Sequence, residues 1–228
     1  NSDFGYAVAV YEDRIAVGAY LFDGVYPDMG AAYVFEREAG APGGWAQARR
    51  FTGNFSSLAH FGLAVAVQGE TVAVGLPENY LEGWALPHEK NLGGPGFWGF
   101  ASIQPAVTYS SGFGGSLSME DSTLLVGRSD LSVFVYEHSG PGTWTEIKAL
   151  KNQNVLGLDN FGSSVDLSGD TALVGCSRCD HCDIQSGAAF VFERNLGGPN
   201  NWGESRIICP SDPLFEDRFG DAVAIDGD

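Results

Sequence analysis

Four cysteines are the side chains whose spacing most clearly suggests chemistry. Cys176, Cys179 and Cys182 form a Cys-x-x-Cys-x-x-Cys segment, and Cys209 follows later in the chain. Thiolates three residues apart can share a zinc ion or an iron–sulfur cluster, whereas paired thiols form disulfides. Because four cysteines allow three disulfide connectivities, the spacing alone leaves open both the kind of site and the pairing.

Asn54 is a candidate site for covalent modification. It begins the tripeptide Asn-Phe-Ser, an acceptor for N-linked glycosylation when a protein is secreted. Such tripeptides also occur by chance, so the significance of Asn54 depends on the compartment of the protein.

No catalytic residues are expected from the motifs. The histidines fall at unrelated places, and none belongs to a nucleophile elbow or a two-histidine metal motif: His60, His88, His138 and His181. The sequence also lacks the Gly-x-x-x-x-Gly-Lys-Ser/Thr loop that cradles phosphates.

The composition excludes several classes of protein. The 228 residues carry a net charge of −17, which argues against nucleic-acid binding because phosphates must be neutralised by Lys and Arg. No run of apolar residues is long enough to span a membrane in this segment. A hydrophobic fraction of 44% is too high for a disordered chain. The segment is therefore expected to fold around a core.

An internal repeat of about 50 residues positions these side chains. Each repeat starts with Phe-Gly, at Phe4-Gly5, Phe61-Gly62, Phe113-Gly114, Phe161-Gly162 and Phe219-Gly220. A short acidic or glycine turn follows, then an apolar run that ends in Val-Gly. Four of the repeats close with a tryptophan that we interpret as a structural anchor: Trp45, Trp98, Trp144 and Trp202.

Each full repeat contains four runs that are typical of β-strands. The first alternates large and small residues, and the third is rich in aromatic and β-branched residues, as in the segment 30–37. Four antiparallel strands per repeat predict a blade of a β-propeller. In the second repeat Pro87 cannot donate to a ladder, so we expect its third strand to be an edge or a distorted strand.

These residues resemble FG-GAP repeats, which build the propeller at the head of integrin α-subunits. The likeness rests on the Phe-Gly start, the Val-Gly end of the second strand and the third strands Gly-Ala-Ala-Tyr-Val-Phe and Gly-Ala-Ala-Phe-Val-Phe. It implies an all-β fold in which residues 1–228 form one β-propeller of four-stranded blades. The repeats are expected at approximately residues 3–58, 59–110, 111–157, 158–215 and, in part, 216–228.

The resemblance also bears on metals and cysteines. Integrin-type repeats often carry a Ca²⁺ loop, but the corresponding turns here hold too few carboxylates for that cation, so no cofactor is expected. A looser Ca²⁺ site in the loop Asp23–Asp28 is a weaker alternative. Because the family is common outside cells, we favour two disulfides over zinc for the four cysteines.

The resemblance implies a non-catalytic, extracellular or cell-surface module for protein or glycan binding, adhesion or assembly. Two alternatives stay open: a building block of an extracellular coat or filament, and an enzyme acting on glycans at the propeller mouth. The first strands carry mainly Ala, Val, Ser and Gly, which disfavours the enzyme. Expected partners are an extracellular protein or glycan, or further copies of the same protein. Binding is expected at the long loops that follow the second strands, residues 20–29, 77–83 and 176–186.

The length suggests a partial propeller. Four full repeats are followed by a further first strand, expected over Phe219–Ile225, which duplicates the strand that begins at Phe4. A seven-bladed ring of such repeats would need about 350 residues. We therefore expect about four blades plus one strand of a larger propeller.

Overall fold

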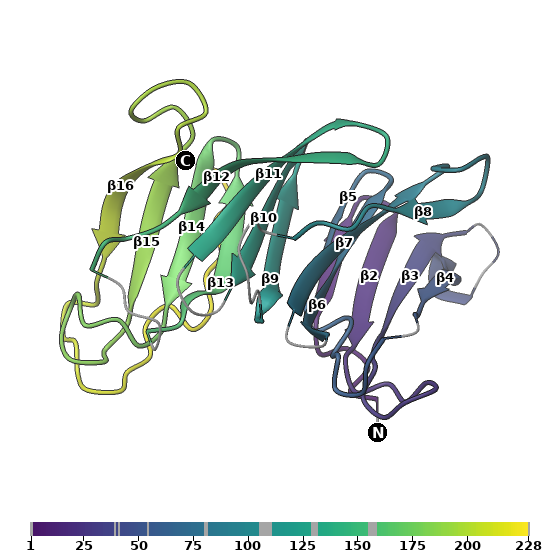
Figure 1. The fold of residues 1–228 in the computed structure, drawn as a ribbon, viewed down its shortest axis with the longest axis horizontal. Helices are drawn as coiled ribbons and strands as arrows, with labels where there is room; N and C mark the ends of the chain where they lie inside the picture. Colours follow the sequence, from purple (N-terminus) through teal and green to yellow (C-terminus); the bar gives the residue numbers. More distant parts are fainter. Residues whose placement is uncertain are drawn as a thin grey trace. The chain divides into compact units, whose positions relative to one another are not determined.

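The structure is a computed structural model that describes residues 2–38, 40, 42–53, 55–79, 82–104, 111–128, 132–154 and 159–227. In these ranges the strands form four antiparallel sheets of four strands each (Figure 1). These sheets confirm the predicted all-β fold with four-stranded blades. None of the described segments is a helix that could cross a bilayer.

Each sheet is built from strands that follow one another along the chain, so each repeat supplies one blade. Blades 1 and 2 contain β1 (Val8–Tyr11), β2 (Arg14–Ala19), β3 (Ala31–Arg37), β4 (Trp45–Phe51), β5 (Val65–Gln68), β6 (Thr71–Asn79), β7 (Glu82–Lys90) and β8 (Trp98–Phe100). Blades 3 and 4 contain β9 (Phe113–Glu120), β10 (Thr123–Arg128), β11 (Ser132–Gly140), β12 (Thr143–Leu150), β13 (Phe161–Ser168), β14 (Thr171–Cys176), β15 (Ala188–Glu193) and β16 (Gly203–Ile208). A short 3₁₀ turn, η1 (Pro42–Gly44), precedes β4.

The chain divides into two compact units, Asn1–Gly115 with Gly140–Thr143, and Ser116–Ser139 with Trp144–Asp228. Each unit has its own core. In the first, apolar side chains of blades 1 and 2 pack together, including Val34, Phe61 and Val74. In the second, the core includes Val133, Leu150, Phe161, Phe190 and Trp202. In both units, burial depends on side chains from consecutive repeats.

Two-residue turns join the first and second strands, as the acidic and glycine turns predict. Tyr11 pairs with Arg14, and Ser168 pairs with Thr171, which leaves only two residues in each of these turns. The first turn residue is left-handed in all four blades, with φ of 48° to 55°: Glu12, Gly69, Asp121 and Gly169. Positive φ at this position suits the tight turn of a β-hairpin.

The Phe-Gly pairs join one repeat to the preceding one. The Phe61 backbone N–H donates to the Met29 carbonyl at 3.0 Å. Gly18, at the end of β2, lies so close to Gly62 that a Cβ on Gly18 would overlap the Gly62 carbonyl oxygen. Gly175 and Gly220 make the same approach in the second unit. The glycine of Val-Gly in one repeat therefore faces the glycine of Phe-Gly in the next.

The residue before each Phe-Gly pair is also left-handed, with φ between 43° and 85°: Asp3, His60, Gly112, Asn160 and Arg218. Side chains rarely adopt this conformation, so its recurrence at non-glycine residues shows that the junction imposes it. The phenylalanines that follow are buried at Phe61, Phe113 and Phe161, and partly buried at Phe219. Phe4 is 54% exposed and lies against Tyr33 of its own blade.

Of the two outcomes expected for Pro87, an edge strand or a distorted strand, the structure shows the second, because β7 lies between β6 and β8. The Pro87 carbonyl accepts a hydrogen bond from Ala101 N–H at 3.0 Å, so its donor-less nitrogen faces the β8 side of the sheet. Pairing on that side ends at Phe100 and resumes only as a bridge between Ala85 and Ile103. The distortion therefore lies in the pairing between β7 and β8. On the other side of β7, Pro87 still pairs with Ala73 of β6.

The expected strand over Phe219–Ile225 is absent from the described residues, so this prediction is wrong. Phe219 makes an isolated parallel bridge to Gly187, but the residues after it form no strand. The segment is instead held to blade 4 by side chains: Ile225 N–H donates to the Asp166 carboxylate at 2.8 Å, and Gly227 N–H donates to the Ser168 hydroxyl at 3.1 Å. A first strand pairs with the second strand of its own repeat, and no described strand takes that place.

We expect Gly62→Ala to destabilise the protein more than Gly5→Ala, by about 2 kcal/mol. The two glycines are equivalent, with φ of 89° and 95°, so both substitutions carry the same backbone strain. Only at Gly62 would the new Cβ overlap a backbone carbonyl, that of Ala31, whereas no described atom lies within 4 Å of a Cβ on Gly5. Urea unfolding of both variants measures the difference, and equal losses would contradict the close-approach explanation.

Candidate functional site

The cysteines form a doubly bonded loop at one end of blade 4. This Cys loop, residues 176–187, connects β14 to β15 and contains the Cys176–Cys179 disulfide. A second disulfide joins Cys182 to Cys209, which follows β16, with 5.5 Å between their Cα atoms. All four thiols are thereby used, so no cysteine remains to ligate a metal. The structure thus adopts one of the three connectivities that the sequence left open.

Blade 1 contains a loop of the same length and backbone pattern. This loop, residues 19–30, lies between the same Val-Gly and Gly-Ala-Ala segments as the Cys loop. In the Cys loop, Gln185 N–H donates to the Asp180 carboxylate at 2.7 Å; in the blade 1 loop, Asp28 N–H donates to the Asp23 carboxylate at 3.1 Å. The two loops are therefore structural equivalents, residue by residue.

The equivalent loops differ in how they are fastened. Val25 and Thr52 of blade 1 occupy the places that Cys182 and Cys209 hold in blade 4, according to the loop lengths and strand registers. In place of a disulfide, blade 1 has a cavity of about 470 Å³ whose lining includes Phe22, Val25, Met29, Arg50 and Thr52. The Arg50 guanidinium lies 5.3 Å from the centre of the Phe22 ring. Blade 4 thus has a disulfide at the place where blade 1 has the unbonded side chains of Val25 and Thr52.

Metal ligands do not converge in the part of the chain that the structure describes. It contains no group of three or more His, Cys, Asp or Glu side chains placed to hold a metal ion. Asp23 and Asp28, the candidates for a looser Ca²⁺ site, are joined by the backbone hydrogen bond within their loop.

The histidines are dispersed, and His88 has a clear packing role. Its ring stacks on Phe51 with 3.9 Å between centroids, and Nδ1 lies 2.8 Å from the Leu86 carbonyl oxygen. Burial lowers the pKa of His88 to about 4, so the ring is neutral at pH 7. By strand register His88 stands where blade 1 has Phe35. It therefore occupies an aromatic position of the repeat, and it is buried there whereas Phe35 is only partly buried.

The other histidines contact separate partners. His60 Nδ1 lies 3.3 Å from the Glu78 carboxylate, the His138 ring packs at a tilt against Trp144, and His181 meets the Phe190 ring edge to face. No two of these contacts share a residue, so the histidines form no common site.

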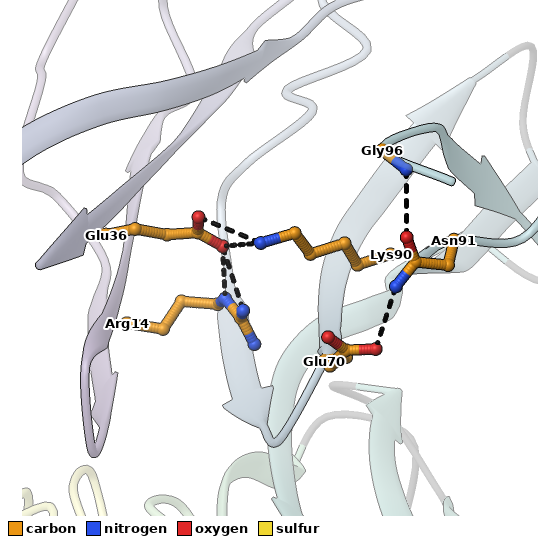
Figure 2. Close-up of polar contacts among 6 residues, drawn as sticks. All are labelled: Arg14, Glu36, Glu70, Lys90, Asn91 and Gly96. Atoms are coloured by element: carbon orange, nitrogen blue, oxygen red, sulfur yellow. Dashed lines mark hydrogen bonds and ion pairs between the residues drawn. The ribbon is translucent and has the colours of Figure 1, made fainter. Parts of the chain in front are cut away.

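A polar cluster joins blades 1 and 2 within the first unit. Figure 2 shows Glu36 of β3 between Arg14 of β2 and Lys90, the last residue of β7. The Glu36 carboxylate lies 2.8 Å from Arg14 Nη2 and 2.9 Å from Lys90 Nζ. Burial opposes ionisation of Glu36, but the hydrogen bonds and charges of Lys90 and Arg14 outweigh it and lower its pKa. We call Arg14, Glu36 and Lys90 the inter-blade clamp.

Arg194 makes an equivalent clamp in the second unit. It ends the third run of blade 4, as Lys90 ends that of blade 2, and it lies 3.3 Å from Glu137 of blade 3. Arg194 also pairs with Asp170 at 2.6 Å and covers the Trp202 ring at 4.7 Å. Among the described residues, a basic residue at the end of a third strand thus binds a glutamate of the preceding blade at two places.

The tryptophans lie beside these basic side chains. Arg37 covers Trp45 at 4.6 Å and Arg14 lies 5.6 Å from the Trp98 ring centre. Trp202 is 2% exposed, whereas the other three repeat tryptophans are half-buried. Their stacking under arginine was not anticipated from the sequence, although the equal spacing of Arg37 to Trp45 and Arg194 to Trp202 carries the signal.

A cavity of about 310 Å³ adjoins the clamp, lined by Glu12, Asp13, Glu70 and the clamp residues, among others. The polar groups around it are largely engaged with one another. Figure 2 shows Asn91 donating to the Glu70 carboxylate at 3.1 Å and accepting from Gly96 N–H at 2.9 Å. This arrangement orders the turn after β7 and joins two blades, which is a structural task.

We expect Lys90→Met to lower the free energy of unfolding by about 1 kcal/mol at neutral pH. Because the clamp lowers the pKa of Glu36, its stabilisation is present above the ordinary carboxyl value of 4.5 and is lost as the pH falls and Glu36 is protonated. The loss should therefore be full at neutral pH and shrink in acid. Urea unfolding across this range measures it, with Lys151→Met, an exposed lysine outside the strands, as control. A loss that does not change with pH would contradict the clamp.

We expect non-reducing mass mapping after cleavage before aspartate residues to recover two disulfides. One should lie within the peptide Asp170–Cys179, and the other should link the peptide Asp180–Cys182 to the peptide Asp183–Ser211, which contains Cys209. Thiol titration of the denatured protein should find no thiol before reduction. Free thiols together with stoichiometric zinc would instead favour the metal site.

The comparisons with known proteins agree with this geometry. A family model described as FG-GAP repeat matches residues 1–35 and 144–192. No curated protein matches the chain. Among solved structures, the crystal structure of the computationally designed Ika4 protein is similar in fold, with a TM-score of 0.52 and 12% identity over 85% of this chain and 92% of that chain. The matched segments contain Phe4-Gly5 and the third strand of blade 4, two features that carried the likeness in the sequence. The chain thus contains two segments that match the FG-GAP repeat, and its blades agree with the propeller fold that the repeats predicted.

Proposed function

We propose that this FG-GAP β-propeller module is non-catalytic, acts outside the cell or at its surface, and binds a protein or glycan through the Cys loop. The observation that carries the proposal is the fastening of this loop by two disulfides on a blade. Disulfides persist in oxidising compartments, and a loop that is already ordered loses little entropy on binding. Binding residues are commonly found on loops held by a rigid scaffold.

Glycosylation at Asn54 belongs to the same proposal. Asn54 lies outside the described residues, so it stays a prediction from the Asn-Phe-Ser sequence. Its neighbour Ser56 donates its N–H to the Asn79 side chain at 3.1 Å. A glycan at Asn54 would agree with passage through the secretory pathway.

The chain supplies its own matched replacement for the loop. In the graft variant, residues 176–186 are replaced by the sequence of residues 19–29, and Cys209 is replaced by Thr, its counterpart in blade 1. Because the two loops have equal length and hydrogen-bond pattern, we expect the variant to fold. We expect it to lose partners that the unaltered protein captures from arrays of glycans and extracellular proteins.

The reciprocal graft, with the Cys loop sequence and Thr52→Cys in blade 1, is the control for general surface effects. Circular dichroism and urea unfolding check that each variant is folded. Unchanged binding by a folded graft variant would contradict the Cys loop as the binding element.

Assembly is a second candidate function, and one observation favours it. On the outer face of blade 1, Phe4, Val8 and Val10 are 54%, 68% and 69% exposed, although their counterparts Phe61, Val65 and Val67 are buried core residues. An apolar sheet face of this kind favours contact with further copies of the same protein. Light scattering on the samples used for binding would detect such assembly, and Val8→Lys should abolish it.

A further inference from the structure

A polar cavity lies between the Cys loop and the turn that precedes Phe219. Its volume is about 330 Å³, and its walls are Arg178, Gln185, Glu216 and Arg218. All four residues belong to the second unit. The volume is near the lower end of the range for ligand pockets, about 300 to 1,000 Å³.

The backbone around this cavity is held from several sides. Arg178 lies inside the Cys176–Cys179 disulfide ring, and its N–H donates to the Asp159 carbonyl at 3.0 Å. On the opposite wall, the Phe219 N–H donates to the Ser186 carbonyl at 2.9 Å, which ties the turn to the Cys loop. The side chains that line the cavity thus project from an ordered backbone, which favours binding by lowering its entropic cost.

The two guanidinium groups retain hydrogen-bonding capacity. Arg218 Nη2 pairs with Asp221 at 2.9 Å, which uses one part of a group with five N–H donors. The Arg178 guanidinium has no hydrogen-bond or ion-pair partner among the described side chains. In a chain with only 12 basic residues, two arginines on one cavity are a local exception to the acidic surface.

The repeat itself does not require these side chains. The equivalent residues at the junction after blade 1 are Leu21, Asp28, Leu58 and His60. The backbone is the same at both junctions: φ is 50° at Gln185 and 53° at Asp28, 63° at Glu216 and 61° at Leu58, and 58° at Arg218 and 55° at His60. The same fold is therefore built with a leucine in place of Arg178, so packing does not explain the arginines.

We propose that this cavity binds the carboxylate of an acidic sugar unit, such as a uronic acid. A guanidinium binds a carboxylate through two parallel hydrogen bonds, a role that Arg178 can fill without breaking an existing pair. The Gln185 amide and the Glu216 carboxylate can bind sugar hydroxyls. The four lining residues are all polar and can hydrogen-bond several hydroxyl groups around a sugar ring, which favours a sugar over an acidic peptide. This inference rests on the proposed binding function and names its ligand class.

The test uses the full chain and a trimer of galacturonic acid, with the neutral galactose trimer as matched probe. Calorimetric titration should give a dissociation constant below about 1 mM for the acidic trimer and no heat of binding for the neutral trimer. Arg178→Ala should weaken the affinity for the acidic trimer at least about tenfold. Arg178→Lys should keep only part of this affinity, because a lysine cannot bind a carboxylate bidentately. Arg206→Ala, an exposed arginine of β16, removes the same charge and should leave binding within about twofold. Added salt should weaken the interaction.

The outcomes separate this inference from the proposed function. No binding of the acidic trimer, or equal loss in Arg178→Ala and Arg206→Ala, overturns the carboxylate site. If neutral glycans or proteins from the arrays still bind through the Cys loop, the proposed function stands without this ligand. If acidic peptides bind at Arg178 and the sugar does not, the ligand class is wrong. If nothing binds in any arm, both proposals fail.

Discussion

The contact between two glycine backbones from consecutive repeats is the constraint on which the rest of this structure depends. Gly18 and Gly62, like Gly175 and Gly220, approach so closely that neither position can hold a side chain. The approach of Gly18 to Gly62, and the same approach of Gly127 to Gly162, places Phe61 and Phe161 in the cores formed with the preceding blades. The two glycines that define the repeat in the sequence are thus the two sides of a single interface, and each repeat needs its neighbour to complete it.

Charged side chains reinforce the same junction at another edge of the blades. Glu36 and Glu137 each bind a basic residue supplied by the following blade. The basic residue is a lysine in one case and an arginine stacked on tryptophan in the other. Both clamps therefore have a positive charge at this position, but the side chains that carry it differ. An acidic protein with few basic residues commits several of them to holding consecutive repeats together. Arg178 and Arg218 differ from these residues because they line a cavity and, in the described part of the chain, bind no carboxylate of a neighbouring blade.

The strand order could be predicted because its signals lie close together in the sequence. The Phe-Gly, Val-Gly and turn residues are spaced by single strands, and each constrains its own backbone. For Pro87 two outcomes stayed open, an edge strand or a distorted strand, because a sequence does not say which neighbour a missing N–H would face. The strand predicted over Phe219–Ile225 does not form, although its composition is typical of a strand. A strand needs a partner to pair with, and of these described residues only Phe219 makes a bridge.

The candidate site was less predictable than the fold because it depends on contacts between distant residues. The cysteine cluster was visible, but its connectivity required Cys209 to be placed next to Cys182. The cavity joins Arg178 to Arg218, and the clamp joins Glu36 to Lys90; neither pair shares a local motif. The role of His88 became clear only when the strand register aligned it with Phe35.

The twin loops of blades 1 and 4 have a consequence for how such a protein can diversify. Their backbone shape is set by glycines at each end and by an aspartate that caps the turn from inside, as Asp23 and Asp180 do. On this shared backbone, one loop carries two disulfides and the other lines a cavity with side chains such as Phe22 and Val25. The repeat can therefore present different side-chain chemistry at equivalent positions. A reducing environment would break the bonds that hold the Cys loop and leave the blade 1 loop unchanged.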